Sequence, residues 1–473
     1  MHSVAAGSPF DNLIIGAGPA ATGVALAMLA SSDSVLQQST LIATGEVLRD
    51  PSLARSTLAP IDMTPGWSEK AFGLPAVRAF GNGGTSTLWH GGLFVPDPQD
   101  RLFNHQGDPV DLNTMLSDLT RSPCFAALPI SDALADIAAR ASTTDGNRWR
   151  TILVPRGRPS LISPAGLPLP ASVRFDTRMV IGLDQGRHRT WRAWLSGPEG
   201  IDIVEARRIF LTAGCLATLR LLAPLSGQFD LGFTDHLHVF AGIVHANDLP
   251  AALRENILPR RSSVAGYTER QTWKTHIRQD GMACDIALSF RAVADPEFPR
   301  AGRRYGRFIG SRATGMMGKM ALAARHPITA IEMLSYKLGM EIPFNTYLVH
   351  ATIAPHGRVG SVSADMIDFS PNVALLAKGV ASAFEELCLE NRIPFGRITR
   401  PFSTDDIAGS MISGAQFSSG LGNSALSVPD SNNIVVADMA NMGFTSVYNQ
   451  TLLSITSGYH HGRIAFSGQG QPI

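Results

Sequence analysis

A glycine-rich turn near the start of the chain has the composition of a phosphate-binding loop. The apolar run 12–15 is followed by Gly16-Ala17-Gly18-Pro19-Ala20-Ala21 and then by a helix-like run over 24–30. A pyrophosphate is bound by backbone N–H groups and the positive end of a helix, and only glycine lets the main chain approach that closely. The motif alone is weak evidence, because any tight strand-to-helix turn resembles it. The residues expected at the phosphates are Gly16, Gly18, Pro19, Ala20 and Ala21.

The next expected strand, residues 39–46, should end beside the ribose of a bound dinucleotide. An acidic residue usually holds the ribose hydroxyl groups at that point. Ala43 and Thr44 occupy the expected position, and Glu46 is the nearest carboxylate. We therefore assign Glu46 to the nucleotide site as the substitute for the usual acid.

Three more groups of residues, distant in the sequence, could complete the same site. A second glycine cluster spans residues 81–89, an apolar strand over 206–212 ends in a glycine turn, and residues 433–453 combine an apolar strand with a polar segment. The expected cofactor-binding residues of these groups are Gly83, Gly84, Thr85, Ser86, Trp89, Ala213, Gly214, Asp438, Gln450 and Thr451.

Composition indicates an ordinary globular protein. The chain has 473 residues, of which 44% are hydrophobic and 17% are charged, and this length is sufficient for two large domains. A net charge of +1 argues against bulk nucleic-acid binding. The four cysteines lack C-x-x-C spacing and are expected to be buried thiols in a reducing compartment. No apolar run approaches the ~18 residues of a membrane span, and no export signal is recognised, so we expect a cytoplasmic protein.

The order of strands and helices predicts an α/β fold in two parts. A βαβ unit at the N-terminus is followed by an antiparallel meander over 171–210, with turns at 184–186 and 197–200, and by a helix over 216–222. Residues 245–424 contain many arginines and less regular periodicity. We predict a doubly wound, Rossmann-like nucleotide domain assembled from residues 1–245 and 425–473, and an α+β substrate or cap domain with an antiparallel sheet over 246–424.

The order of motifs resembles that of the glucose-methanol-choline oxidoreductases, which bind FAD and mostly oxidise alcohols. In motif style it is closest to pyranose oxidases and sugar-acid dehydrogenases. The resemblance implies an FAD-dependent oxidoreductase acting on CH–OH groups by hydride transfer to the flavin, with Asn449 facing the substrate oxygen. The matching segments are the first glycine turn, 83–89, 206–214, 217–222, Asp235-His236, 357–362, 435–438 and 449–452.

Two departures from the family pattern bear on the chemistry. Leu88 stands where pyranose oxidases carry the histidine that links to the flavin, so the FAD is expected to be bound non-covalently. The run 412–420 corresponds to the segment that normally holds the catalytic histidine, and it contains none. Ser413 and Gln416 can orient a hydroxyl group but cannot accept its proton near pH 7. With Asn449 they form the expected catalytic set.

The missing histidine leaves alternatives open. His236 and His238 alternate on an expected strand and could replace the base, or could form a structural Asp-His hinge between domains. His350 and His356 are more typical of ordinary surface or core histidines. No metal site is expected, because the histidine-rich segments lack Cys or carboxylate partners at ligand spacing. The alternative function is a flavin-binding protein with lost or altered dehydrogenase activity, acting as a partner subunit or in redox-neutral chemistry.

A basic band in the expected cap domain bears on its partners. Residues 254–325 contain fourteen Lys or Arg and six Asp or Glu. Such a band is a solvated face, or it attracts an anionic substrate, a phosphorylated carrier or an acidic partner. We expect a hydroxyl-bearing substrate that is sugar-like or carrier-linked. Methionine-rich helical runs at 316–322 and 331–340 pack in a core, or rest on a membrane surface. The electron acceptor is not indicated by any motif.

Overall fold

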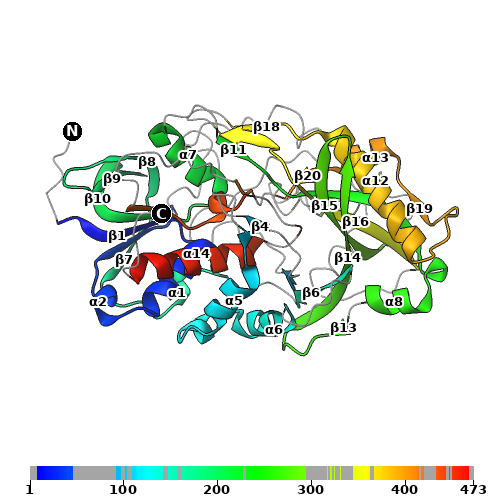
Figure 1. Ribbon diagram of the computed structural model, residues 1–473, viewed down its shortest axis with the longest axis horizontal. Coiled ribbons are helices and arrows are strands. Elements are labelled where there is room, and N and C mark those ends of the chain that lie inside the picture. The colour runs from blue at the N-terminus through cyan, green and yellow to red at the C-terminus, as the bar shows by residue number, and fades with distance from the viewer. Residues whose placement is uncertain are drawn as a thin grey trace.

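The structure is a computed structural model of the 473-residue chain. Two sheets lie at opposite ends of the molecule, and helices pack on both (Figure 1). The description covers the residue ranges 8–45, 92–96, 102–103, 109–141, 148–156, 161–226, 231–258, 260–293, 345–362, 367–414, 417–419, 433–443, 447 and 450–467, with positions 317, 320, 321, 324, 327 and 331.

A seven-stranded sheet forms the nucleotide end of the molecule. Its central strand is parallel to a strand on each side, in the order β7-β2-β1-β10, and β21 is parallel to β10. The expected meander is present as the antiparallel series β8-β9-β10, whereas β7 joins the parallel edge instead. The strands are β1 (Phe10–Ile15), β2 (Thr40–Ala43), β7 (Val173–Asp176), β8 (Met179–Gln185), β9 (Trp191–Gly197), β10 (Gly200–Leu211) and β21 (Ile434–Val436).

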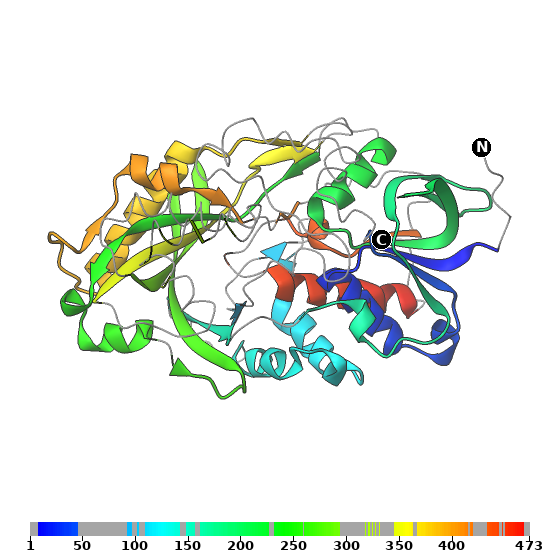
Figure 2. The ribbon, with the colours of Figure 1, turned by 180° about the vertical axis from the view of Figure 1, so that it is seen from behind.

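Apolar composition explains why this sheet is covered on both faces. The residues of β1 from Asn12 to Ile15 are buried, as expected for a central parallel strand. Helices from both ends of the chain pack beside each other against the sheet, and they remain side by side when the molecule is turned (Figure 2). The helices of this half are α1 (Pro19–Leu29), α2 (Asp33–Leu36), α5 (Leu112–Thr120), α6 (Ser131–Ala141), α7 (Cys215–Ser226) and α14 (Gln450–Phe466).

A nine-stranded sheet forms the other end, and the pairings among its four central strands are antiparallel. Its main path is β19-β12-β16-β15-β14-β6-β3, with β13 beside β14 and β20 beside β12. The helices of this end are α8 (Ala251–Ile257), α12 (Val373–Glu390) and α13 (Thr404–Ser410). The strands are β3 (Leu93–Phe94), β6 (Trp149–Pro155), β12 (Leu237–His245), β13 (Arg260–Arg261), β14 (Tyr267–Gln279), β15 (Met282–Val293), β16 (Thr346–Pro355), β19 (Arg400–Pro401) and β20 (Ile412–Ser413).

The smaller elements connect the two ends. A three-stranded sheet has the order β11-β17-β18, and β4 pairs with β5. These strands are β11 (Leu231–Phe233), β17 (Gly360–Val362), β18 (Ile367–Phe369), β4 (Leu102–Phe103) and β5 (Pro109–Val110), and the short 3₁₀ helices are η2 (Phe125–Ala127), η3 (Pro164–Gly166), η4 (Ala246–Asp248) and η8 (Met439–Asn441).

The nine-stranded sheet does not begin at residue 246. Strands β3, β6 and β12 come from the part of the sequence assigned to the nucleotide domain, yet they pair within this sheet. The chain therefore enters the second sheet before residue 100, again near residue 149 and again after Asp235. Within the part of the chain that the structure describes, no helix is long and apolar enough to cross a membrane.

Candidate functional site

The first glycine turn has the geometry of a phosphate-binding loop. Gly16 follows β1 with φ +114°, a conformation that residues with a Cβ rarely adopt, and a methyl group there would collide with the carbonyl of Thr212. Gly18 is the N-cap of α1, and Pro19 is its first residue. Among the described residues no side chain caps this helix end, and the N–H groups at such a helix start are the groups that bind a phosphate. Ala20 and Ala21, also assigned to the site, are buried in the first turn.

The two ends of the chain meet at this loop through glycine contacts. A methyl group on Gly23 of α1 would overlap the carbonyl oxygen of Ile455 in α14, and one on Gly458 would overlap that of Ala20. The helices can approach this closely only because both positions lack a side chain. Gln450 and Thr451 begin α14 and are both buried. The sequence-predicted N-terminal and C-terminal parts of the site therefore belong to one packed unit.

Asp438 joins the closing strand to the turn after β10. Its Oδ2 accepts a hydrogen bond of 2.9 Å from the backbone N–H of Gly214 and another from the hydroxyl of Thr218, and its Oδ1 accepts one from Ala440. Burial raises the pKa of Asp438 to about 6, although these three hydrogen bonds oppose the shift. The expected grouping of Ala213, Gly214 and Asp438 is thus present, with Asp438 holding the protein backbone in place.

Thr44 supplies a further indication of a ligand. It follows β2, at the place where an acid would contact a ribose, and it is 6% exposed. Among the described residues its hydroxyl oxygen has no hydrogen-bond partner, and burying such a group without a partner is costly. The glycine loop, the uncapped helix and this hydroxyl group are the features that a bound dinucleotide would satisfy. The residues present therefore fit FAD.

Several predicted site residues lie outside the described residues. These are Glu46, Gly83, Gly84, Thr85, Ser86, Trp89, Gln416 and Asn449, together with Leu88. The backbone of Ser413 is described, and it pairs in β20 with Leu237 of β12. The roles of these residues stay predictions.

The run 412–420, as far as it is described, lies between the Asp-His pair and the closing nucleotide strand. Gly414 donates its N–H to the carbonyl of His236 at 2.8 Å, and Ser418 pairs with Thr234. Ser419 donates to the carbonyl oxygens of Met439 and Ala440, directly after Asp438. The segment that lacks a histidine is therefore flanked by one supplied from another part of the chain.

Three histidines form a row beside this segment. The ring centroids of His236 and His238 are 4.8 Å apart, and those of His238 and His350 are 5.0 Å apart. The hydroxyl of Thr352 lies 3.2 Å from Nδ1 of His238, within hydrogen-bond distance. His236 is 2% exposed, whereas His238 is half-buried. The rings of His236, which precedes β12, and of His238 on β12 are thus neighbours, and His350 joins them from β16.

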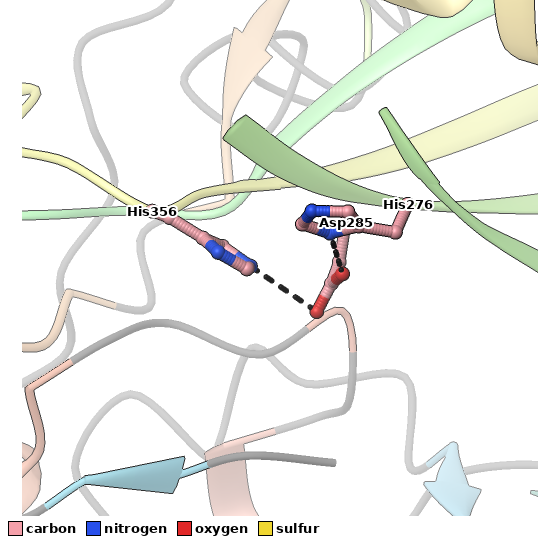
Figure 3. A group of neighbouring side chains, drawn as sticks. All are labelled: His276, Asp285 and His356. Carbon is pink, nitrogen blue, oxygen red and sulfur yellow. Dashed lines mark hydrogen bonds and ion pairs between the residues drawn. The ribbon is translucent and has the colours of Figure 1, made fainter. Parts of the chain in front are cut away.

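A second cluster on this sheet was not predicted. His276 of β14 pairs in register with Asp285 of β15, and its Nδ1 lies 2.9 Å from Oδ1 of Asp285. His356, which follows β16, places Nε2 3.4 Å from Oδ2 of the same carboxylate. Both imidazole rings point at Asp285 (Figure 3). The expectation that these histidines lack a carboxylate partner is wrong for His356, because sheet register, which sequence spacing does not reveal, brings Asp285 to it.

The charges around Asp285 decide what this cluster can do. Burial would raise the pKa of Asp285, but hydrogen bonds with His356 and His276 and the charge of Lys274 hold it well below its ordinary value. Two imidazoles and a carboxylate within 4.8 Å could hold a metal ion. However, the Lys274 ammonium lies 3.8 Å from Asp285, and Arg278 donates to His276. These cations oppose a bound metal, so the arrangement favours a hydrogen-bonded cluster.

The four cysteines and the two histidines of α14 lie outside the two histidine clusters. All four cysteines are free thiols, three of them buried, and burial raises the pKa of Cys284 and of Cys388 to about 12. On α14, His461 contacts the side chain of Asn441 at 2.6 Å, and burial lowers the pKa of His460. Seven of the fourteen Lys or Arg of the basic band, and most of both methionine-rich runs, lie outside the described residues.

Comparisons with known proteins identify the fold. No family model and no curated protein matches the sequence. Solved structures do match, including pyridoxine 4-oxidase from Mesorbium loti, at 12% identity over 98% of this chain and all of that one, with a TM-score of 0.52. A fungal aryl-alcohol oxidase and a formate oxidase also match, each at 12% identity over the same shares, with TM-scores of 0.49 and 0.47. The fold is that of the glucose-methanol-choline oxidoreductases, as the motif order indicated.

Proposed function

We propose that the chain is an FAD-dependent oxidoreductase that oxidises the CH–OH group of a small hydroxyl-bearing substrate. The observation that carries this proposal is the nucleotide site built from both ends of the chain. Gly16, Gly18 and the start of α1 would bind the pyrophosphate, and Thr44 would lie by the ribose. When bound, FAD supplies the hydride acceptor.

The chain itself must orient the substrate hydroxyl group and accept its proton. Asn449, Ser413 and Gln416 are suited to the first task, because amides and hydroxyl groups donate and accept hydrogen bonds without ionising near pH 7. Imidazole is suited to the second. The row formed by His236, His238 and His350 lies beside the run 412–420 and supplies that chemistry. This row favours an active dehydrogenase over a flavin-binding protein without activity.

The first experiment tests the cofactor. The purified protein should be yellow, and acid precipitation should release FAD into the supernatant, because Leu88 occupies the position of the linking histidine. Flavin that remains with the precipitated chain would contradict non-covalent binding. A colourless protein that takes up no FAD would contradict the proposed function.

The second experiment tests the reaction. Hydroxyl compounds are mixed anaerobically with the FAD-loaded protein, and a substrate is recognised by loss of the flavin absorbance. Asn449→Ala should retain FAD but reduce it about 10²-fold more slowly, the scale for losing a hydrogen bond made in the transition state. Unchanged reduction in this variant would remove Asn449 from the reaction. Failure of every hydroxyl compound to reduce the flavin would favour the alternative without dehydrogenase activity.

A further inference from the structure

The two faces of the nine-stranded sheet differ in composition. One face packs on α12, where Gly379 lies against Ile277, Met282 and Cys284. Side chains alternate between the faces of a strand, so this contact assigns the odd-numbered residues of β14 and the even-numbered residues of β15 to the α12 face. Thr275 agrees, because its hydroxyl donates to Glu386 of α12.

The opposite face carries a positive charge. Register pairs His276 with Asp285, Lys274 with Ala287, and Arg150 with Thr272, which places all of these on that face. On the described strands of the sheet this face has a single Asp or Glu, Asp285, against seven basic side chains. These are Arg150, Arg261, Arg270, Lys274, Arg278, Arg291 and Arg400.

This basic face is directed toward the nucleotide end of the molecule. Helices α12 and α13 lie on the outer side of the sheet, away from α1 and α14 (Figure 1). On the inner side, Val447 packs against Ala287 and Ala354, which share the basic face. Val447 is two residues from Asn449, and His238 is in register with Thr352 on the same face. The basic residues therefore lie on the same side of the sheet as Val447 and His238, which belong to or neighbour the proposed reaction site.

We propose that the substrate is an anion, a hydroxy acid or a phosphate ester, whose charged oxygens bind at Lys274 and Arg278, beside the His276–Asp285–His356 cluster. The inference rests on the proposed function, because it concerns the substrate of that site. The carboxylate, phosphate and sulfate groups share the chemistry of an oxyanion, which accepts hydrogen bonds from ammonium, guanidinium and imidazole donors. The hydroxyl group to be oxidised would then extend toward Val447 and the flavin.

The negative charge of Asp285 does not cancel the attraction of the basic face for an anionic substrate. Lys274 and Arg278 provide two permanent positive charges against one negative charge, and the two imidazoles already share the carboxylate of Asp285. The side chain of Lys274 is 14% exposed, so its charge is screened less than that of a surface lysine. Asp285 fixes the orientation of both rings, as Figure 3 shows. An oxyanion would meet donors that are already positioned.

Paired substrates test this inference. Anaerobic flavin reduction is compared for gluconate against glucose, and for glycerol phosphate against glycerol. An anionic member should be preferred in kcat/KM by roughly tenfold or more, the scale for one charge-assisted hydrogen bond. A neutral member that reduces the flavin equally well or better overturns the inference and leaves the proposed function intact. The carboxylate and phosphate arms show which oxyanion is bound.

A matched pair of lysine variants locates the site. Lys274→Met should raise the KM for the anionic substrate roughly tenfold. The KM for its neutral counterpart should not change. Lys378→Met removes an exposed lysine from α12, on the other side of the sheet. This variant should leave the KM for the anionic substrate and the KM for the neutral substrate unchanged. FAD content and the thermal midpoint report folding of each variant. Equal behaviour of the two variants with the anion overturns the assignment.

Direct binding to the FAD-loaded protein makes the test independent of turnover. Inorganic phosphate and acetate are titrated calorimetrically, and at least one should bind to the wild type and more weakly to Arg278→Gln. Zn²⁺ is titrated in parallel against the wild type and Asp285→Asn. If neither anion binds, while Zn²⁺ binds and Asp285→Asn abolishes its binding, the cluster is a cation site and the inference is wrong. The absence of all binding also overturns it.

Discussion

The two sheets of this molecule place their chemistry in different ways. In the seven-stranded sheet the candidate site lies at the ends of parallel strands, where backbone N–H groups, glycines and a helix end converge. In the nine-stranded sheet the candidate groups are side chains on one face of antiparallel strands. The first arrangement depends on a short local sequence, and the second depends on which residues pair across strands.

This difference has a physical consequence for tolerance to substitution. The nucleotide site needs backbone atoms at close range, so a single added carbon atom can prevent assembly. The basic face of the second sheet uses side chains, most of them exposed or half-buried, whose removal should leave the strands intact. Substitutions at the first sheet should therefore affect folding and FAD together, while those at the second should affect rate and affinity.

The largest effect is expected at the contact between α1 and α14. In Gly23→Val, the new Cβ would overlap the backbone oxygen of Ile455, which cannot move without shifting α14. We expect a loss of roughly 3 kcal/mol or more in the free energy of unfolding, and loss of bound FAD. Thermal denaturation and the FAD-to-protein absorbance ratio measure both.

A glycine near the other sheet provides the control for this change. A methyl group on Gly409 of α13 meets no atom within 4 Å. Gly409→Ala should keep FAD and leave the thermal midpoint unchanged or slightly higher, since alanine favours a helix. If Gly23→Val and Gly409→Ala behaved alike, close backbone packing would not be what distinguishes the nucleotide end.

The same difference explains what could be predicted from the sequence. The turn at Gly16 and the strands ending at Gly214 and Asp438 were predicted, because each rests on a local pattern of glycine, apolar and acidic residues. The hydrogen bonds of Asp438 to the protein backbone were not predicted. The pairing of His276 with Asp285 was missed. The two residues lie on adjacent strands of one hairpin, and only the register and the approach of His356 turn them into a cluster.

Sequence reasoning also failed to place the strands that change sheets. The composition of β6 and β12 does not mark them as part of the second sheet. β6 pairs with β14 and β12 pairs with β16, each more than a hundred residues later in the sequence. A strand's sheet is decided by long-range pairing and not by its own periodicity.

The histidine row is expected to control the rate of flavin reduction without affecting FAD binding. His238→Gln should slow reduction by about 10²-fold and remove the inflection of the pH profile in the range where an imidazole titrates. His245→Gln, on the same strand but with its Nδ1 bonded to the backbone of Asn247, is the control and should keep the wild-type rate. Stopped-flow absorbance measures both. A wild-type rate in His238→Gln would exclude this row as the base.

One carboxylate in each half, Asp438 and Asp285, should give opposite pH dependences of stability. Asp438 has its pKa raised from 3.8 to about 6, so its folded form gains stability on protonation, and this gain is lost as the pH rises through 6. The pKa of Asp285 is lowered, so its contribution is present above 3.8 and is lost as the pH falls through its folded pKa.

Thermal midpoints of FAD-loaded variants measure this contrast. Relative to Asp438→Asn, the wild type should gain stability between pH 7 and pH 4, because asparagine does not titrate. Relative to Asp285→Asn, it should lose stability as the pH falls below about 4. Slopes of the same sign would show that the two carboxylates are not in the contrasting environments described here.

The smallest effect is expected at Thr44, where the nucleotide sheet does depend on a side chain. Its buried hydroxyl group has no partner among the described residues, so a bound ribose is the group that would satisfy it. Thr44→Val keeps the shape and removes the hydroxyl group, and it should weaken FAD binding by up to about tenfold, the scale of one hydrogen bond.

Ser457→Ala is the control. It removes another buried hydroxyl group without a described partner, but Ser457 lies within α14, so the FAD affinity should be unchanged. Fluorescence titration with FAD measures both affinities. If Thr44→Val binds FAD as tightly as the wild type, the hydroxyl group does not meet the nucleotide, and the nucleotide sheet acts through its backbone alone.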